Sequence, residues 1–197
     1  MPYALVEARR VLADRRTGAV NRTAQGFAEL LSAHWAHLYR FAYHLTGNRD
    51  DADDLIQQAA EEALRAFGRF RPGTRFDRWF MRILYTAFID RVRRQRRRSV
   101  ASLDDIPHAA IPADPAADPE TLVARWIDGP VRRALASLPA EYRAAVVLID
   151  MHEMSYDEAA AILHCPVGTV RSRLHRGRLA LREWLRPYVD AMKRGDL

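Results

Sequence analysis

The sequence predicts an all-α protein made of two small helical lobes joined by a proline-rich acidic linker. Apolar residues recur at spacings of three and four in both halves of the chain, and neither half contains a hairpin signal or a useful alternating apolar run. Between the halves, residues 99–120 carry five acidic side chains, four prolines and no Lys or Arg. Because proline lacks the amide donor that a helix interior requires, this stretch is predicted to be a linker. The predicted parts are a basic extension (1–26), a first lobe (27–98), the linker (99–120), a second lobe (121–190) and a tail (191–197).

The composition favours an acidic partner such as nucleic acid. The 197 residues carry a net charge of +6, and Lys193 is the only Lys among 31 basic residues. The planar guanidinium of Arg suits bidentate contacts to phosphates and guanine edges, although the codon bias of a GC-rich genome gives the same excess of Arg. Cys165 is the only cysteine, which excludes an intrachain disulfide, and no apolar run approaches the length of a membrane span. We therefore expect a cytoplasmic protein that does not insert into a membrane.

Two predicted helices of the first lobe carry opposite charges. Within residues 50–67 the apolar residues form one stripe, and the opposite face holds Asp54, Gln57, Gln58 and Glu61. The next helix is basic, because residues 75–98 contain nine Arg against two Asp. We expect it to turn Phe76, Phe80, Ile83, Leu84 and Ala87 inward. Its other side is expected to gather Arg78, Arg82, Tyr85, Ile89, Arg93 and Arg96.

The second lobe is predicted to end in a helix-turn-helix, preceded by helices at 121 to about 136 and 140 to about 152. Ser155 followed three residues later by Glu158 is a capping box, which predicts a helix to about Leu163, and Pro166 suits the first turn of the next helix. On that second helix Val167, Val170 and Leu174 fall on one side and are predicted to pack inward. The opposite side then carries residues of the kind that contact DNA: Gly168, Arg171, Ser172, His175 and Arg176.

Two blocks together resemble a bacterial RNA polymerase sigma factor of the extracytoplasmic-function (ECF) group. Region 2 of that family is similar to "LYRFAYHLTGNRDDADDLIQQAAEEALRAF" followed by "FDRWFMRILYTAFIDRVRRQRRR", and region 4 is similar to "ALASLPAEYRAAVVLIDMHEMSYDEAAAILHCPVGTVRSRLHRGRLALREWL". A helix-turn-helix alone is weak support because many regulators contain one, but the acidic helix followed by an aromatic, Arg-rich helix makes the pair specific. The resemblance implies an alternative sigma factor that binds core RNA polymerase, recognises the −35 and −10 promoter elements and promotes initiation of transcription.

The resemblance implies two interfaces on the first lobe. The β′ clamp helices of core polymerase would dock on Asp53, Asp54, Gln57 and Gln58, where Gln58 replaces the usual Glu of the family. The next helix would melt and bind the −10 element, because aromatic rings receive unstacked bases and arginines neutralise phosphates. Trp79 also fits core packing, and Thr86 replaces the family's usual Asn, so no base preference is carried over. The residues implied for −10 binding are Arg78, Trp79, Arg82, Tyr85, Thr86, Arg91, Arg93 and Arg94.

The second lobe would bind the −35 element and meet the β flap of the polymerase. The residues implied for −35 binding are Gly168, Thr169, Arg171, Ser172, His175 and Arg176. The acidic linker of the family threads toward the RNA exit path. An anti-sigma factor is implied as a further partner, and no catalytic residue, metal site or cofactor is expected.

Three other classes of protein compete with this interpretation. An enzyme is disfavoured because the sequence has no phosphate-binding glycine loop, HExxH or CxxC motif, and His34 with His37 is only a single pair. A stand-alone helix-turn-helix transcriptional regulator would leave the acidic helix and the aromatic basic helix without a role. A sigma mimic that titrates an anti-sigma factor is expected to have lost its basic faces, and both are present here.

Overall fold

The computed structural model describes residues 18–101 and 129–194, and gives side-chain surroundings for 24–98 and 129–194. The first part contains α2 (Gly18–Thr46), α3 (Arg49–Ala66), a short 3₁₀ turn, η1 (Phe67–Arg69), and α4 (Phe76–Ala101). The second contains α5 (Gly129–Ser137), α6 (Ala140–Val146), a π-helical turn, η4 (Val147–Met151), α7 (Tyr156–Leu163) and α8 (Val167–Arg194). Neither described part contains a strand, so the all-α prediction is confirmed.

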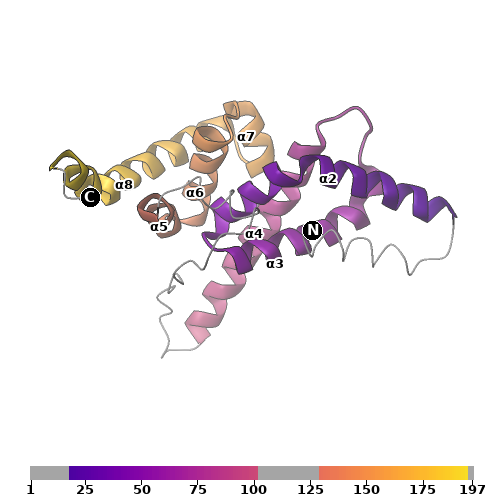
Figure 1. The fold of residues 1–197 in the computed structure, drawn as a ribbon, viewed down its shortest axis with the longest axis horizontal. Helices are drawn as coiled ribbons and strands as arrows, with labels where there is room; N and C mark the ends of the chain where they lie inside the picture. Colours follow the sequence, from indigo (N-terminus) through magenta and orange to yellow (C-terminus); the bar gives the residue numbers. More distant parts are fainter. Residues whose placement is uncertain (1–17, 102–128, 195–197) are drawn as a thin grey trace.

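In the first lobe α2, α3 and α4 lie side by side (Figure 1). The side chain of Asn48 caps α3 by accepting a hydrogen bond from the backbone N–H of Asp51 (2.8 Å). The apolar stripe predicted on α3 is confirmed, and its buried residues are Ala52, Leu55, Ile56, Ala59, Ala60 and Ala63. The bundle therefore forms through the stripe that the sequence predicts, and leaves the acidic side of α3 outside.

The second lobe contains the predicted helix-turn-helix. The Ser155–Glu158 capping box is present, α7 ends at Leu163 as expected, and α8 begins directly after Pro166. The turn between them uses a left-handed residue, His164, with φ of 50°. Val170 and Leu174 are fully buried as predicted, whereas Val167 is only half-buried because it lies at the first turn of α8.

Several predicted boundaries shift. The helix of the first lobe starts at Gly18, within the predicted extension, and α4 extends to Ala101, so the start of the predicted linker is helical. The helix expected at 121–136 is described from Gly129, and α8 continues into the predicted tail as far as Arg194. Residues 1–17 of the extension, 102–120 of the linker, 121–128 and 195–197 lie outside the described parts.

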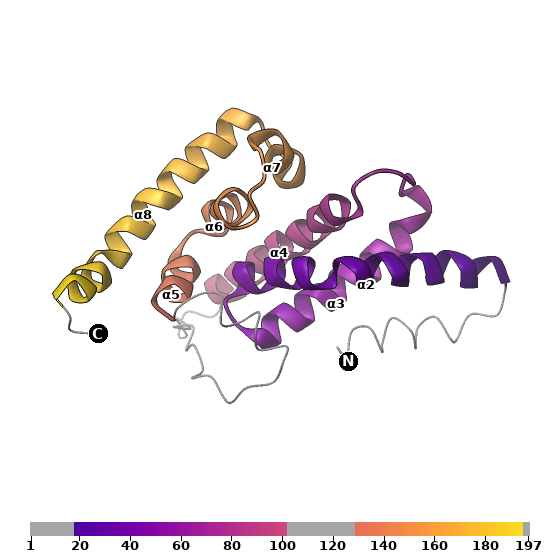
Figure 2. The same ribbon diagram turned by 45° about the horizontal axis from the view of Figure 1, so that its top comes forward.

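The two lobes pack against each other, a contact that the sequence did not predict. Their buried residues form one continuous cluster, and Figure 2 shows α7 beside α4. The guanidinium of Arg143 on α6 donates hydrogen bonds to the carbonyls of Leu45, Ala136 and Leu138, which joins the end of α2 to the second lobe. Burial lowers the pKa of Arg143 to about 10, so this guanidinium stays charged at neutral pH.

Candidate nucleic-acid and partner interfaces

The acidic face of α3 lies on the outside of the first lobe. Asp53 and Asp54 are exposed, while Gln57 and Gln58 are half-buried at the edge of the apolar stripe. Asp53 lies 4.0 Å from Arg49 one turn earlier, and the amide of Gln58 donates to Glu62 (3.0 Å). These contacts are local, so the face remains open to a basic partner.

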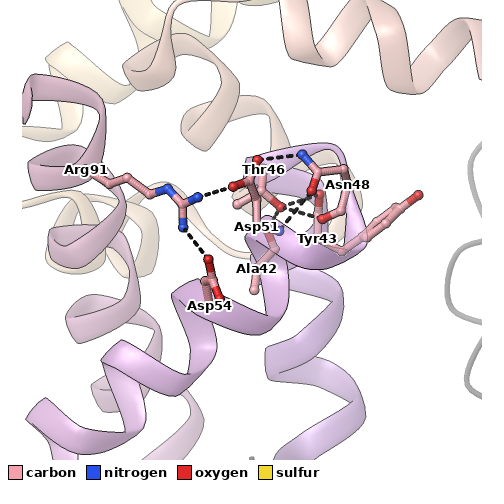
Figure 3. Close-up of polar contacts among 7 residues, drawn as sticks. All are labelled: Ala42, Tyr43, Thr46, Asn48, Asp51, Asp54 and Arg91. Atoms are coloured by element: carbon pink, nitrogen blue, oxygen red, sulfur yellow. Dashed lines mark hydrogen bonds and ion pairs between the residues drawn. The ribbon is translucent and has the colours of Figure 1, made fainter. Parts of the chain in front are cut away.

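Arg91 of α4, one of the residues that the resemblance implied for −10 binding, turns toward α3. Figure 3 shows its guanidinium between the carboxylates of Asp51 and Asp54, with Asp54 at 3.8 Å. The Asp54 side chain still has 73% of its surface exposed. Arg91 therefore stabilises the packing of α3 on α4 in this structure. The nearby Arg93 and Arg94 are exposed.

The helix-turn-helix covers the middle of the basic face of α4. Arg78 forms an ion pair with Glu158 of α7, and Nε of Arg82 donates a hydrogen bond to the imidazole of His164 in the turn. The hydrogen bond from the Ser155 backbone, with Arg78 nearby, lowers the pKa of Glu158, so this carboxylate is ionised at neutral pH. Thr86 is exposed, and its hydroxyl donates to the carbonyl of Arg82 (2.9 Å).

Tyr85 and Ile89 were expected on the Arg-rich side of α4, opposite its apolar stripe, but they are not exposed to solvent there. Their exposed fractions are 7% and 8%. The second lobe packs on this side of α4, so the two apolar side chains fill the junction between the lobes. Burial raises the pKa of the Tyr85 hydroxyl, which remains protonated at neutral pH.

Trp79 is half-buried and belongs to an aromatic cluster at the start of α4. Its ring centroid lies 5.1 Å from that of Phe70, 5.7 Å from Phe76 and 6.2 Å from Phe67. The three ring pairs are tilted, and aromatic pairs of this kind stabilise a fold beyond the area they bury. Trp79 therefore contributes to packing and also presents part of its surface to solvent.

The outward face of α8 is open. Gly168, Arg171, Ser172, His175 and Arg176 are all exposed, and Thr169 beside them is half-buried. The hydroxyl of Ser172 donates to the carbonyl of Thr169 (3.0 Å). The orientation that the apolar spacing predicted for this helix is confirmed.

The packing of α8 depends on Gly177, which the sequence interpretation missed. A Cβ at this position would lie 2.7 Å from Cγ2 of Val146, so only glycine allows this approach of α8 to α6. One residue further, the Arg178 guanidinium makes a bidentate contact to Asp150, with Nε 3.0 Å from one carboxylate oxygen. Gly177 follows the buried Val170 by seven residues, about two helical turns, so it lies on the same side of α8. This spacing was the sequence signal for the close contact.

Two tyrosines beside this face were also missed. The hydroxyl of Tyr142 on α6 accepts a hydrogen bond from Nη1 of Arg176 (3.2 Å), and the ring of Tyr156 lies 5.3 Å from the guanidinium carbon of Arg171. Nothing in the apolar spacing connects these positions, because each tyrosine belongs to a different helix from its arginine.

Three histidines meet where α2 faces the second lobe. The ring of His152 lies 4.7 Å from that of His37 and 5.8 Å from that of His44, and Phe41 packs on it edge-on. Burial lowers the pKa of His44 to about 4 and that of His152 to about 3, so both are neutral at pH 7. Among the described residues no group of His, Cys, Asp and Glu could hold a metal ion. None of the described helices is long and apolar enough to cross a bilayer.

Comparison with known proteins matches each of the two helical lobes to a family. Residues 30–98 match the family model for Sigma-70 region 2, and residues 129–181 match that for Sigma-70, region 4. The chain is 31% identical over 166 residues to the ECF RNA polymerase sigma factor SigW of Bacillus subtilis, covering 81% of this chain and 89% of that protein. It is 40% identical over 157 residues to the ECF sigma factor SigE of Mycolicibacterium smegmatis, covering 80% of this chain but only 60% of that protein.

Two solved structures are similar over most of their length. One is the sigma factor RpoE in complex with the anti-sigma factor NepR from Bartonella quintana, with a TM-score of 0.66 and 30% identity, covering 82% of this chain and 98% of that one. The other is CnrH in complex with the cytosolic domain of CnrY, with a TM-score of 0.56 and 25% identity, covering 93% and 97%. With both sigma regions matched in order and a match to SigW that covers more than four fifths of each chain, the chain belongs to the ECF group of bacterial RNA polymerase sigma factors, alternative sigma factors for the initiation of transcription.

Proposed function

We propose that this chain binds core RNA polymerase through α3 and promoter DNA through α4 and α8, and performs no covalent chemistry of its own. The observation that carries the proposal is the open face of α8, where five residues suited to base and phosphate contacts stand exposed on the second helix of a helix-turn-helix. That face would bind the −35 element through Gly168, Thr169, Arg171, Ser172, His175 and Arg176.

The acidic face of α3 supports docking of the polymerase β′ clamp helices. Asp53 and Asp54 project from the first lobe, with Gln57 and Gln58 one turn further along. Because the clamp helices of the family are rich in basic side chains, opposite charge would both steer the encounter and hold the complex. The contact from Arg91 to Asp54 is long enough to yield to such a partner.

The basic face of α4 supports binding of the −10 element once the second lobe has moved away. In the structure the two lobes are packed together, which we call the closed arrangement. In it Arg93 and Arg94 are exposed, whereas Arg78 and Arg82 contact the helix-turn-helix. Separation of the lobes on core polymerase would release these arginines together with Tyr85. Trp79 would then offer its exposed part to an unstacked base, while the rest of its ring stays in the aromatic cluster.

An anti-sigma factor is the further partner that we propose. The two similar structures are both complexes, one with the anti-sigma factor NepR and one with the cytosolic domain of CnrY. Such a partner fits a chain whose junction between lobes already buries part of the proposed −10 face. The β flap would meet the flank of the second lobe.

Run-off transcription tests the proposed function as a whole. Core polymerase with this chain is expected to start transcription on genomic fragments, beginning with the region upstream of its own gene, whereas core polymerase alone does not. Co-purification with core without run-off would favour a mimic that titrates an anti-sigma factor. Specific DNA binding without co-purification would favour a stand-alone regulator.

Reversal of charge at Asp54 tests the docking face. Asp54→Lys is expected to abolish binding to core polymerase, because it places a like charge against a basic surface at an exposed position. The melting temperature should remain within a few degrees of that of the wild type. Asp157→Lys, a matched reversal at an exposed position on α7, should bind core normally. Unchanged affinity of Asp54→Lys would contradict the assignment.

A further inference from the structure

Arg171 and Arg176, the two exposed arginines of the α8 face, each contact a tyrosine that belongs to another helix. Nη1 of Arg176 donates to the hydroxyl of Tyr142 on α6 (3.2 Å). The guanidinium of Arg171 lies over the ring of Tyr156, the first residue of α7, at 5.3 Å from the centroid. Both arginines are exposed and both tyrosines are half-buried. Each exposed arginine is therefore in contact with a tyrosine that the surrounding packing restrains.

The surrounding packing fixes where these tyrosines stand. The glycine at position 177 lets α6 and α8 approach closely, and a Cβ there would lie 3.4 Å from the carbonyl oxygen of Tyr142. This approach brings the Tyr142 hydroxyl to the neighbouring Arg176. Tyr156 directly follows Ser155, whose capping box fixes the start of α7. Neither tyrosine depends on the linker for its position.

Holding an arginine before it binds DNA has a physical consequence. A free Arg side chain loses rotamer freedom when it is ordered by a ligand, and a contact already present in the free protein removes part of that cost. The hydrogen bond from Arg176 occupies one of its five N–H donors, and a cation–π contact occupies the face of the Arg171 guanidinium rather than its edge. Donors therefore remain available for a base edge or a phosphate.

We propose that Tyr142 and Tyr156 are positioning residues for the −35 contact, which hold Arg176 and Arg171 in the orientation in which they bind DNA. The inference rests on the proposed function, because it assumes that these arginines contact the −35 element. The two tyrosines use different chemistry: a hydroxyl that accepts at position 142 and a ring face at position 156. Replacement by phenylalanine removes the hydroxyl at position 142, whereas at position 156 it keeps the aromatic ring.

The test measures DNA specificity with the full chain. A duplex library randomised over one helical turn is enriched on the wild-type chain, and the enriched duplex is compared with a shuffled duplex of equal composition. Tyr142→Phe is expected to lower the ratio of the two affinities about three- to tenfold, which corresponds to the loss of one hydrogen bond. Tyr156→Phe should stay within about twofold of the wild type, whereas Tyr156→Leu should lower the ratio about three- to tenfold.

Arginine variants separate failure of this inference from failure of the proposed function. If nothing is enriched, or if Arg171→Ala and Arg176→Ala keep the wild-type ratio, the −35 assignment is wrong and the inference falls with it. If the arginine variants lose specificity while Tyr142→Phe and Tyr156→Leu do not, only the positioning role is overturned.

A double variant distinguishes positioning from direct contact. Tyr142→Phe combined with Arg176→Ala should show the ratio of Arg176→Ala alone, because the hydroxyl acts through that guanidinium. A further loss in the double variant would mean that Tyr142 contacts DNA itself, which contradicts the inference. Melting curves of all variants, expected within a few degrees of the wild type, exclude a general loss of structure.

Discussion

The helices α4 and α8 both carry an Arg-rich face, yet the two faces have different surroundings. On α4, Arg78 and Arg82 contact the helix-turn-helix, and Tyr85 between the lobes is 7% exposed. On α8, Arg171 and Arg176 are exposed, and each contacts a tyrosine of its own lobe. The same residue pattern thus forms a covered face in one lobe and an open face in the other.

This difference shows that a basic helix face identifies a possible DNA contact but not its availability. While the two lobes are packed together the proposed −35 face is accessible, whereas Arg78, Arg82 and Tyr85 of the proposed −10 face contact the second lobe. The helix that covers α4 is α7, and α7 forms the helix-turn-helix together with α8, the helix that carries the open face. A movement that releases α4 therefore also moves α8, so we expect the two promoter contacts to be coupled through the junction.

Acid is expected to have the largest effect on the packing of the two lobes, because the ring nitrogens of two histidines, His44 and His152, are buried at the junction between them. His44 and His152 have an ordinary pKa of 6.5 when unfolded, and burial lowers these values to about 4 and about 3 in the folded chain. Between pH 6.5 and about 4 the unfolded chain binds more protons, so the free energy of unfolding falls as the pH falls. At pH 5 the loss is about 2 kcal/mol for each of the two histidines.

Urea unfolding at several pH values between 7 and 5 measures this loss. His37 and Arg40 face the same junction from α2 and add positive charge, which disfavours protonation of His152 further. His152→Gln, which cannot titrate, should show a flatter dependence on pH than the wild type. An equally steep dependence in this variant would place the titrating group elsewhere.

A smaller effect is expected when the packing that presents the open face is disturbed. Gly177→Ala places a Cβ 2.7 Å from Val146, so α8 must shift on α6, at a cost of about 1 to 3 kcal/mol. Gly168→Ala is the matched control, because a Cβ at that exposed position meets nothing within 4 Å. Thermal melting should separate the two variants, with only Gly177→Ala less stable. Equal stability would show that α8 is not tightly held at this point.

Much of the fold could be predicted because its signals are local. The capping box at Ser155, the proline before α8 and the apolar stripe of α3 each act within one or two turns, so the sequence alone contains them. The orientation of α8 follows in the same way from Val170 and Leu174, which are fully buried. These features do not depend on how the lobes are placed.

The contacts that could not be predicted join segments far apart in the chain. Tyr85 is buried by residues of the other lobe, so its position on α4 gave no indication of it. Arg91, which the resemblance implied for −10 binding, pairs instead with Asp51, forty residues earlier. Tyr142 lies thirty-four residues from Arg176. Periodicity places a side chain on a face, but only the packing of helices identifies its partner.

The smallest expected effect concerns the ion pair that covers α4. Glu158→Arg replaces the pair with Arg78 by a like-charge contact, and a partly exposed pair of this kind is worth roughly 1 kcal/mol or less. A loss of this size raises the ratio of open to closed chains by about fivefold at most, and the measurement is the radius of gyration from small-angle X-ray scattering, which increases as the lobes separate. The variant also loses the capping box, so Ser155→Ala, which weakens the cap but keeps the Arg78 contact, is the necessary control and should stay closed. Asp157→Arg controls for the added charge at an exposed position on the same helix. If all three variants scatter alike, the junction is held by its apolar contacts around Tyr85 and Ile89, and the ion pair only covers the proposed −10 face without closing it.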